Sequence, residues 1–216
     1  MVIVLIKEDL KRILDKNAIF MSILAVIFNM ATYFFGAVEG TSGGFGSIFR
    51  TEGIVIIFLL YALEFAKVTL TMDKITKKIE FLLANGVKAG LIIAKFILSL
   101  YFATFIVLIP TFIITFVNFK MDFILILNLL ISSILYSILI VYLILFTRNM
   151  NRVNGLQITM IIFSIIINLI AIEVYMLTNM VELYLIVKVC ILMLCIGYLS
   201  FKTNRERIVV SYYWYV

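Results

Sequence analysis

Apolar runs recur along the whole chain, and short segments that carry most of the charges separate them. Each run is about 20 residues long, enough for a helix to cross the roughly 30 Å hydrocarbon layer of a bilayer. Only helices and closed barrels satisfy their own backbone hydrogen bonds in lipid. Because the runs are continuous rather than alternating, they favour helices over barrel strands. The sequence therefore predicts an all-α integral membrane protein.

Composition supports a single membrane domain. The chain is 65% hydrophobic, whereas soluble domains contain roughly 45–50% apolar residues. Little polar sequence is left for a second domain, so residues 1–216 are predicted to form one transmembrane domain. The net charge of +6 could indicate nucleic-acid binding, but the basic residues lie between apolar runs. We therefore expect the bilayer, and no nucleic acid, to be the partner of these charges.

Six spans and two shorter helices are predicted. The spans cover residues 18–38, 53–71, 90–116, 123–146, 156–177 and 183–201. An N-terminal helix over residues 2–16 has apolar residues on one face and charges on the other. We expect this amphipathic helix to lie in the plane of the inner leaflet. A second amphipathic helix is expected over residues 73–85, between spans two and three.

Basic residues predict the orientation. With the N-terminus inside, only Arg50 and Lys120 lie in outer segments, whereas 13 of the 18 basic residues lie in inner ones. These are Lys7, Lys11, Arg12, Lys16, Lys74, Lys77, Lys78, Lys88, Arg148, Arg152, Lys202, Arg205 and Arg207. The bias predicts a multi-pass protein of the cell membrane with both termini in the cytoplasm.

Three cations fall inside spans or at their edges. Lys67 and Lys95 lie near predicted inner ends, where a lysine can extend its ammonium group to the interface. Lys188 lies deeper, so we expect it to face the protein interior and to pair with an acid. The candidate partners are Glu64, Glu173 and Glu182.

The residue inventory argues against catalysis by this chain. Histidine, the commonest general base and metal ligand, is absent. No H-E-x-x-H, C-x-x-C or G-x-x-x-x-G-K-[ST] pattern occurs. We therefore expect no enzyme activity and no metal or other cofactor bound by this chain, and ATP hydrolysis would require a separate subunit.

The stretch "DKITKKIEFLLANGVKAGLIIAK", residues 73–95, departs from the apolar pattern. Apolar residues at spacings i, i+4, i+7 and i+8 form one stripe: Ile75, Ile79, Leu82 and Leu83. Asn85 and Gly86 tolerate the left-handed backbone that ends a helix. From the residues alone, this helix could lie on anionic lipid through its lysines, or it could dock into a soluble partner.

This stretch resembles the loop between spans two and three in the permease subunits of type-2 ABC exporters. That family reads acidic-basic, then G-T-[IL]-E-x-L-L-[AS]-[ST]-P-[VI], then a lysine early in the next span. The matching residues are Asp73, Lys74, Glu80, Leu82, Leu83, Ala84, Val87 and Lys95. Lys77-Lys78 stand in place of Gly-Thr, and Asn85-Gly86 in place of Ser/Thr-Pro. Six spans, an amphipathic N-terminal helix and inner termini also agree with the family.

The resemblance implies a function and partners. The chain would be the permease subunit of an exporter, paired with a second permease subunit in a homo- or heterodimer. A separate ATP-binding-cassette ATPase would carry ATP and Mg²⁺. The residues expected to dock on that ATPase are Ile75, Lys77, Ile79, Glu80, Leu82 and Leu83.

The resemblance also places the translocation path between spans two and five. The residues expected to line it are Tyr61, Glu64, Phe65, Phe163, Ser164 and Asn168. Hydrogen bonding between helices is an equally open role for Ser164 and Asn168. Ile-rich and Phe-rich spans suit an amphipathic or hydrophobic cargo, and the resemblance implies an antimicrobial-type peptide.

Two other functions remain open. A non-transporting membrane anchor or scaffold would share the docking helix but would not need a polar path. An ion-coupled carrier would use a buried carboxylate such as Glu64 as its ion site. An adjacent gene for an ATPase with a phosphate-binding loop would favour the exporter over both.

Topology can be tested by labelling. Single cysteines at Ser42 and Lys120 should react with an impermeant thiol reagent added to intact cells, because both positions lie in predicted outer loops. Cysteines at Lys78 and Arg152 should react only after permeabilisation. Labelling of position 78 from outside would contradict the predicted orientation.

Overall fold

Helices joined by short turns make up the part of the chain that the computed structural model describes, residues 2–38, 44–119, 123–150, 153–203 and 208. Several positions used above lie outside these residues: Ser42, Lys120, Arg152, Arg205 and Arg207. The elements are α1 (Val2–Ile13), α2 (Lys16–Val38), α3 (Gly44–Ala66), the π-helical turn η1 (Lys67–Thr71), α4 (Met72–Ile75), α5 (Lys78–Ala84), α6 (Ala89–Phe119), α7 (Phe123–Phe146), α8 (Val153–Thr178) and α9 (Val181–Lys202).

Five helical stretches in the described residues are long and apolar enough to cross a membrane. They are Gly46–Ile75, Ala89–Val117, Phe123–Phe146, Gly155–Thr178 and Val181–Lys202. A sixth candidate combines α1 and α2, which meet at a bend of 69°. These helices confirm the predicted all-α class, while the six-span layout stays a prediction.

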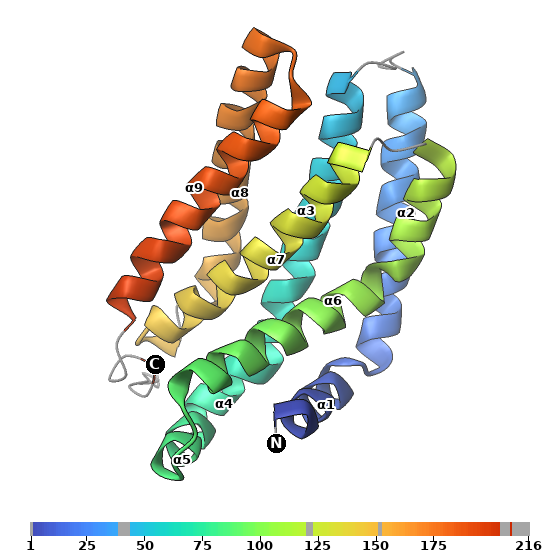
Figure 1. Cartoon of the computed structure of the whole chain (residues 1–216). Helices are drawn as coiled ribbons and strands as arrows, with labels where there is room; N and C mark the ends of the chain where they lie inside the picture. Colours follow the sequence, from blue (N-terminus) through green and yellow to red (C-terminus); the bar gives the residue numbers. More distant parts are fainter. Residues whose placement is uncertain (1, 39–43, 120–122, 151–152, 204–207, 209–216) are drawn as a thin grey trace.

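The long helices form a bundle with α3 and α7 at its centre (Figure 1). In the apolar stretches of α3 and α7, 61% of the residues are buried, against 28% for α8 and 22% for α9. Helix α7 packs against α3 on one side and α9 on the other, and α6 packs against α1, α2 and α3. Phe58 of α3 and Tyr136 of α7 are among the largest fully buried side chains.

Helix α6 carries the only proline of the chain, Pro110, in its interior. A proline there removes one backbone hydrogen bond and favours a bend. Figure 1 shows α6 running obliquely beneath the bundle and then turning alongside α2. Asn29 of α2 holds this second part, because its Nδ2 donates to Thr115 Oγ1 at 2.8 Å.

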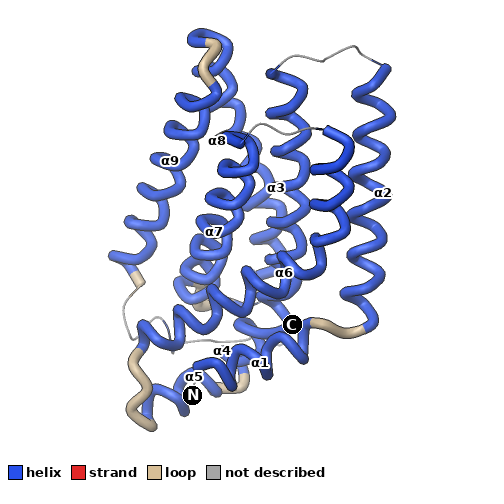
Figure 2. The backbone as a smooth tube through the Cα atoms, turned by 45° about the vertical axis from the view of Figure 1, so that its right-hand side comes forward, coloured by secondary structure: helices blue, strands red, loops and turns tan. Residues whose placement is uncertain are grey.

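Helices α1, α4 and α5 gather at one end of the bundle, which we call the α5 end (Figure 2). The N-terminal helix is present, but its charges do not all face away from the protein, as the amphipathic pattern predicted. Asp9 is fully buried beside Ile13, whereas Lys7 and Lys11 are exposed. Asp9 can be buried because Lys95 of α6 lies 2.8 Å from it.

The second span is longer than predicted. The sequence analysis placed it over residues 53–71, but the helix begins at Gly44 and continues through η1 and α4 to Ile75. Glu52 therefore lies inside a membrane-crossing helix rather than before it. The early start is possible because Glu52 and Thr51 are buried and hydrogen-bonded.

The helix predicted over residues 73–85 is divided into two. Its first residues complete the preceding span as α4, and α5 starts only at Lys78. Lys77 separates them in a left-handed conformation with a φ of 58°. A non-glycine residue in that conformation interrupts a right-handed helix. Residues 73–85 are therefore mostly helical, as the amphipathic pattern predicted, but they do not form one continuous helix.

Gly86 ends α5 in the way that the sequence predicted. Its φ is +80°, and its N–H donates to the carbonyl of Leu83 at 3.1 Å. The N–H of Val87 donates to the carbonyl of Leu82, also at 3.1 Å. This pair of bonds is the Schellman motif, which satisfies the last carbonyls of a helix. Asn85, in contrast, keeps a negative φ of −82°.

Replacement of Gly86 by alanine should destabilise the protein by about 1 kcal/mol, because a Cβ disfavours the left-handed backbone. Steric contact would add nothing, since beyond the two chain neighbours no atom lies within 4 Å of the place that an alanine Cβ would take. Gly90→Ala is the matched control: its site is equally open, it lies in α6, and alanine there should be neutral or stabilising. The measurement is the midpoint temperature of thermal unfolding in detergent. Equal midpoint temperatures for the two variants would contradict this role of Gly86.

Candidate functional site

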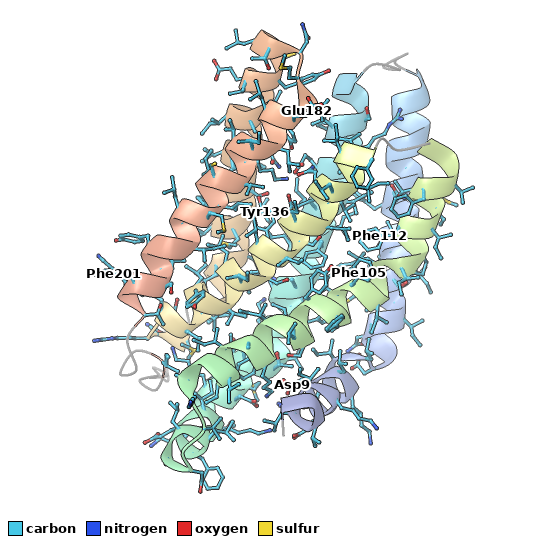
Figure 3. The ribbon with its side chains drawn as sticks, in the orientation of Figure 1. Asp9, Phe105, Phe112, Tyr136, Glu182 and Phe201 are labelled. Atoms are coloured by element: carbon cyan, nitrogen blue, oxygen red, sulfur yellow. The ribbon has the colours of Figure 1, made fainter. Side chains whose placement is uncertain are left out.

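Four charged side chains meet at the α5 end and form what we call the four-charge cluster: Asp9, Arg12, Asp73 and Lys95. Lys95 Nζ lies 2.8 Å from Asp9 and 3.5 Å from Asp73. Arg12 lies 2.9 Å from Asp73 and 3.8 Å from Asp9. Two acids and two bases thus neutralise each other where α1, α4 and α6 meet, and Figure 3 shows Asp9 between α1 and α6.

The cluster corrects the prediction for Lys95. The sequence analysis expected its ammonium group to extend to the membrane interface, but the residue is 1% exposed. An ammonium group can be buried at that depth only when charges and hydrogen bonds compensate its lost hydration. Asp9 and Asp73 supply that compensation, and Ser99 adds a hydrogen bond to Asp9 at 3.4 Å.

Lys74, the neighbour of Asp73, binds the end of α7. Its Nζ donates to the carbonyls of Ile144, Leu145 and Thr147 at 3.2, 2.8 and 2.6 Å. The last carbonyls of a helix have no partner within that helix, and a cation there also favours the negative end of the helix dipole. Lys74 therefore caps α7 from a different element.

Most of the apolar stripe expected to dock on a partner packs against the chain itself. Ile79 is 1% exposed and belongs to the main core, and Leu82 and Leu83 pack against that core. Ile75 is half-buried. This arrangement corrects the expectation of a free stripe: an apolar face beside an apolar bundle is buried intramolecularly before any partner arrives.

The opposite side of α5 is exposed. It carries Glu80, one of the residues expected to dock, together with Phe81, whose exposed fraction is 67%; Lys77, which directly precedes α5, is exposed as well. Lys78 contacts α1 instead, at 3.1 Å from Glu8. The sequence analysis missed Phe81 because it lies off the apolar stripe, and only the packing of α5 shows which side is free.

The predicted path residues of α3 do not share one environment. Phe65 is buried in the core. Tyr61 points towards α2, where its hydroxyl donates to the carbonyl of Met21 at 2.6 Å. Glu64 accepts a hydrogen bond from Gln157 of α8 and lies 3.1 Å from Lys67. Glu64 is thus paired, and its side chain is 42% exposed.

The predicted path residues of α8 are better grouped. Ser164 and Asn168 are both buried, and Phe163 packs against the core. Ser164 exchanges a 2.8 Å hydrogen bond with Tyr136 of α7, which is the interhelical role that remained open above. Within the described residues, Asn168 Oδ1 has no hydrogen-bond partner. Helices α3 and α8 do pack together, so the predicted elements adjoin.

Lys188 has a partner that the sequence analysis did not consider. Its Nζ lies 2.6 and 2.7 Å from the two carboxylate oxygens of Glu52. Tyr184 also donates to Glu52, and Asn128 Nδ2 donates to it at 2.8 Å. The pair is buried between α3, α7 and α9. All its members lie within apolar helices, where charge requires such compensation.

The three acids proposed for Lys188 lie elsewhere, which corrects that expectation. Glu64 is bound to Lys67 and Gln157, and Glu173 and Glu182 are exposed. Figure 3 shows Glu182 at the end of the bundle opposite α5. Glu52 was overlooked because it lies one residue before the predicted start of span two. The sequence signal for Glu52 is that it directly adjoins the predicted span, but nothing in the sequence orients it towards Lys188.

Among the described residues, no three acidic or cysteine side chains come together in a way that could hold a metal ion. Comparison of the chain with protein-family models, with curated proteins and with solved structures gave no match. The function is therefore inferred from the sequence pattern and from the geometry described above.

Lys188→Met should destabilise the protein by roughly 3–5 kcal/mol, because it leaves the Glu52 carboxylate buried without its cation. The double variant Glu52→Gln/Lys188→Met should recover most of that loss, since no unpaired charge remains. Glu64→Gln is the control: its partly exposed pair should contribute about 0–1 kcal/mol. Unfolding titrations in mixed detergent micelles measure all three, and additive effects of the two buried substitutions would contradict the pairing.

Proposed function

We propose that this chain is the membrane subunit of an ATP-driven exporter of the type-2 ABC class. The observation that carries the proposal is the position of α5 at one end of the bundle. One side of this short helix is held by the core through Ile79, and the other side exposes Phe81 and Glu80. A helix fixed on one side and open on the other can receive movement from a soluble partner and pass it into the membrane.

The family pattern fits the local geometry, which further supports the proposal. Lys77 stands where the family has glycine, and its left-handed φ of 58° is a conformation that glycine adopts readily. Asp73 and Lys95 are the acid and the lysine of the pattern, and they lie 3.5 Å apart. The two ends of the pattern thus meet in space, although 22 residues separate them.

The proposal assigns each component a place. The α5 end faces the cytoplasm of the cell, and a separate ATPase chain binds there and holds ATP and Mg²⁺. A second permease subunit completes the membrane part. The path for an amphipathic or hydrophobic cargo, an antimicrobial-type peptide in our proposal, follows α3 and α8. Asn168 is the residue of that path with an unused buried oxygen.

The two alternatives receive less support from the geometry. An ion-coupled carrier needs a carboxylate that can exchange ions, but Glu64 is occupied by Lys67 and Gln157. A passive anchor needs only an exposed docking surface. It leaves unexplained why α4, next to that surface, is joined by buried charges to α1, α6 and α7.

Phe81→Asp should remove the ATPase from the purified complex. The change removes apolar burial of roughly 1.5–3 kcal/mol for a phenylalanine and introduces a charge that must be desolvated, so retention should fall at least about tenfold. The chain is purified from its host membranes in mild detergent. The ATPase is recognised by its phosphate-binding loop in mass spectra and by ATP hydrolysis in the eluate.

Phe201→Asp is the matched control, since Phe201 is also exposed but lies on α9; it should keep the ATPase. Leu83→Asp should damage the permease itself, because Leu83 packs against the core. Wild-type retention of the ATPase by Phe81→Asp, or absence of any ATPase from the wild-type complex, would refute this part of the proposal.

A further inference from the structure

Helix α4 is a four-residue element between two interruptions of the backbone. The π-helical turn η1 precedes it, and the left-handed Lys77 follows it. Short π-helical segments inside α-helices are frequent at functional sites. Helix α4 therefore lies between α3 and α5 with a change of helical geometry on each side.

The two charged residues of α4 are buried on different sides of it. Asp73 is 2% exposed and Lys74 is 1% exposed. Consecutive residues of an α-helix point about 100° apart, since a turn contains about 3.6 residues. The hydrogen-bond partners of Asp73 and Lys74 accordingly lie on different helices.

Asp73 connects α4 to α1 and α6. Its carboxylate accepts from Arg12 at 2.9 Å and from Lys95 at 3.5 Å. Arg12 also donates to the carbonyl of Val68, inside η1, at 3.4 Å. Charged groups thus join α4 to α1 and to the first turns of α6.

Lys74 connects α4 to α7. Its three hydrogen bonds end on carbonyls of the last turn of α7 and of the residue that follows it. Helix α7 lies at the centre of the bundle (Figure 1), where it packs against α3, α6 and α9. Asp73 and Lys74 thus bind different helices from adjacent positions: Asp73 binds α1 and α6, and Lys74 binds α7.

We propose that Asp73 and Lys74 are positioning residues that divide a displacement of α5 between the different helices that they bind. Asp73 moves α1 and α6, and Lys74 moves α7. The inference rests on the proposed function, because the ATPase is what displaces α5. It goes further by assigning each half of the response to one side chain.

The test uses hydrogen exchange, measured by mass spectrometry, on the complete complex with its ATPase in lipid nanodiscs, with and without ATP. In the wild type, ATP should change the exchange of α1, of the first turns of α6 and of the last turn of α7. Asp73→Asn should lose the ATP-dependent change in α1 and α6 and keep it in α7. Lys74→Met should lose the change in α7 and keep it in α1 and α6.

Conservative and peripheral variants separate this role from a loss of folding. Asp73→Glu and Lys74→Arg keep the charges and should restore the change. Arg12→Gln breaks the link from the α1 side, where the side chain is partly exposed, and should lose the change in α1 alone. Lys78→Gln removes an exposed ion pair between α5 and α1 that does not involve α4, so it is the control and should behave like the wild type.

The outcomes distinguish the two proposals. A wild-type complex without an ATPase, or without any ATP-dependent change in these helices, would refute the proposed function. ATP-dependent changes that both variants keep, or that each variant loses in all helices, would refute the division by Asp73 and Lys74 and leave the proposed function standing. If Asp73→Asn does not fold, the Arg12→Gln result decides the α1 link.

Discussion

Lys95 lies between Asp9 and Asp73 at distances of 2.8 and 3.5 Å, and most of the arrangement at the α5 end depends on this contact. A buried ammonium group in an apolar bundle requires anionic partners. The partners come from α1 and α4, which are far apart in the sequence, so both helices are brought onto α6. Only Thr76 and Lys77 connect α4 to α5. Because this connection is so short, the position of α4 largely determines where α5 begins.

Charge compensation recurs wherever the bundle departs from apolar packing. Glu52 and Lys188 join α3 to α9, with Asn128 of α7 between them. Tyr136 and Ser164 join α7 to α8. In lipid, apolar side chains gain little by choosing one apolar neighbour over another. Polar contacts therefore specify which helices are neighbours, and each of the interior contacts described here joins two or more helices.

The hydrophobic effect explains why the apolar stripe on α5 faces the bundle. Next to a large apolar bundle, Ile79 and Leu83 gain burial within their own chain. What remains for a partner is the polar side with one exposed aromatic residue, Phe81. Aromatic residues surrounded by polar ones are effective anchors in protein interfaces. This side, rather than the amphipathic pattern itself, is the surface on which the proposed function depends.

The sequence by itself determined the class of the protein, the approximate positions of its helices and the end of α5 at Gly86, because these depend on local hydropathy and backbone preference. It also indicated that Lys188 needs an acid. It could not identify Glu52, because spans that are apolar on every side carry no periodicity that orients them. The tertiary structure alone decided that pairing, the burial of Asp9 and Lys95, and the exposed side of α5, since each depends on which helices become neighbours.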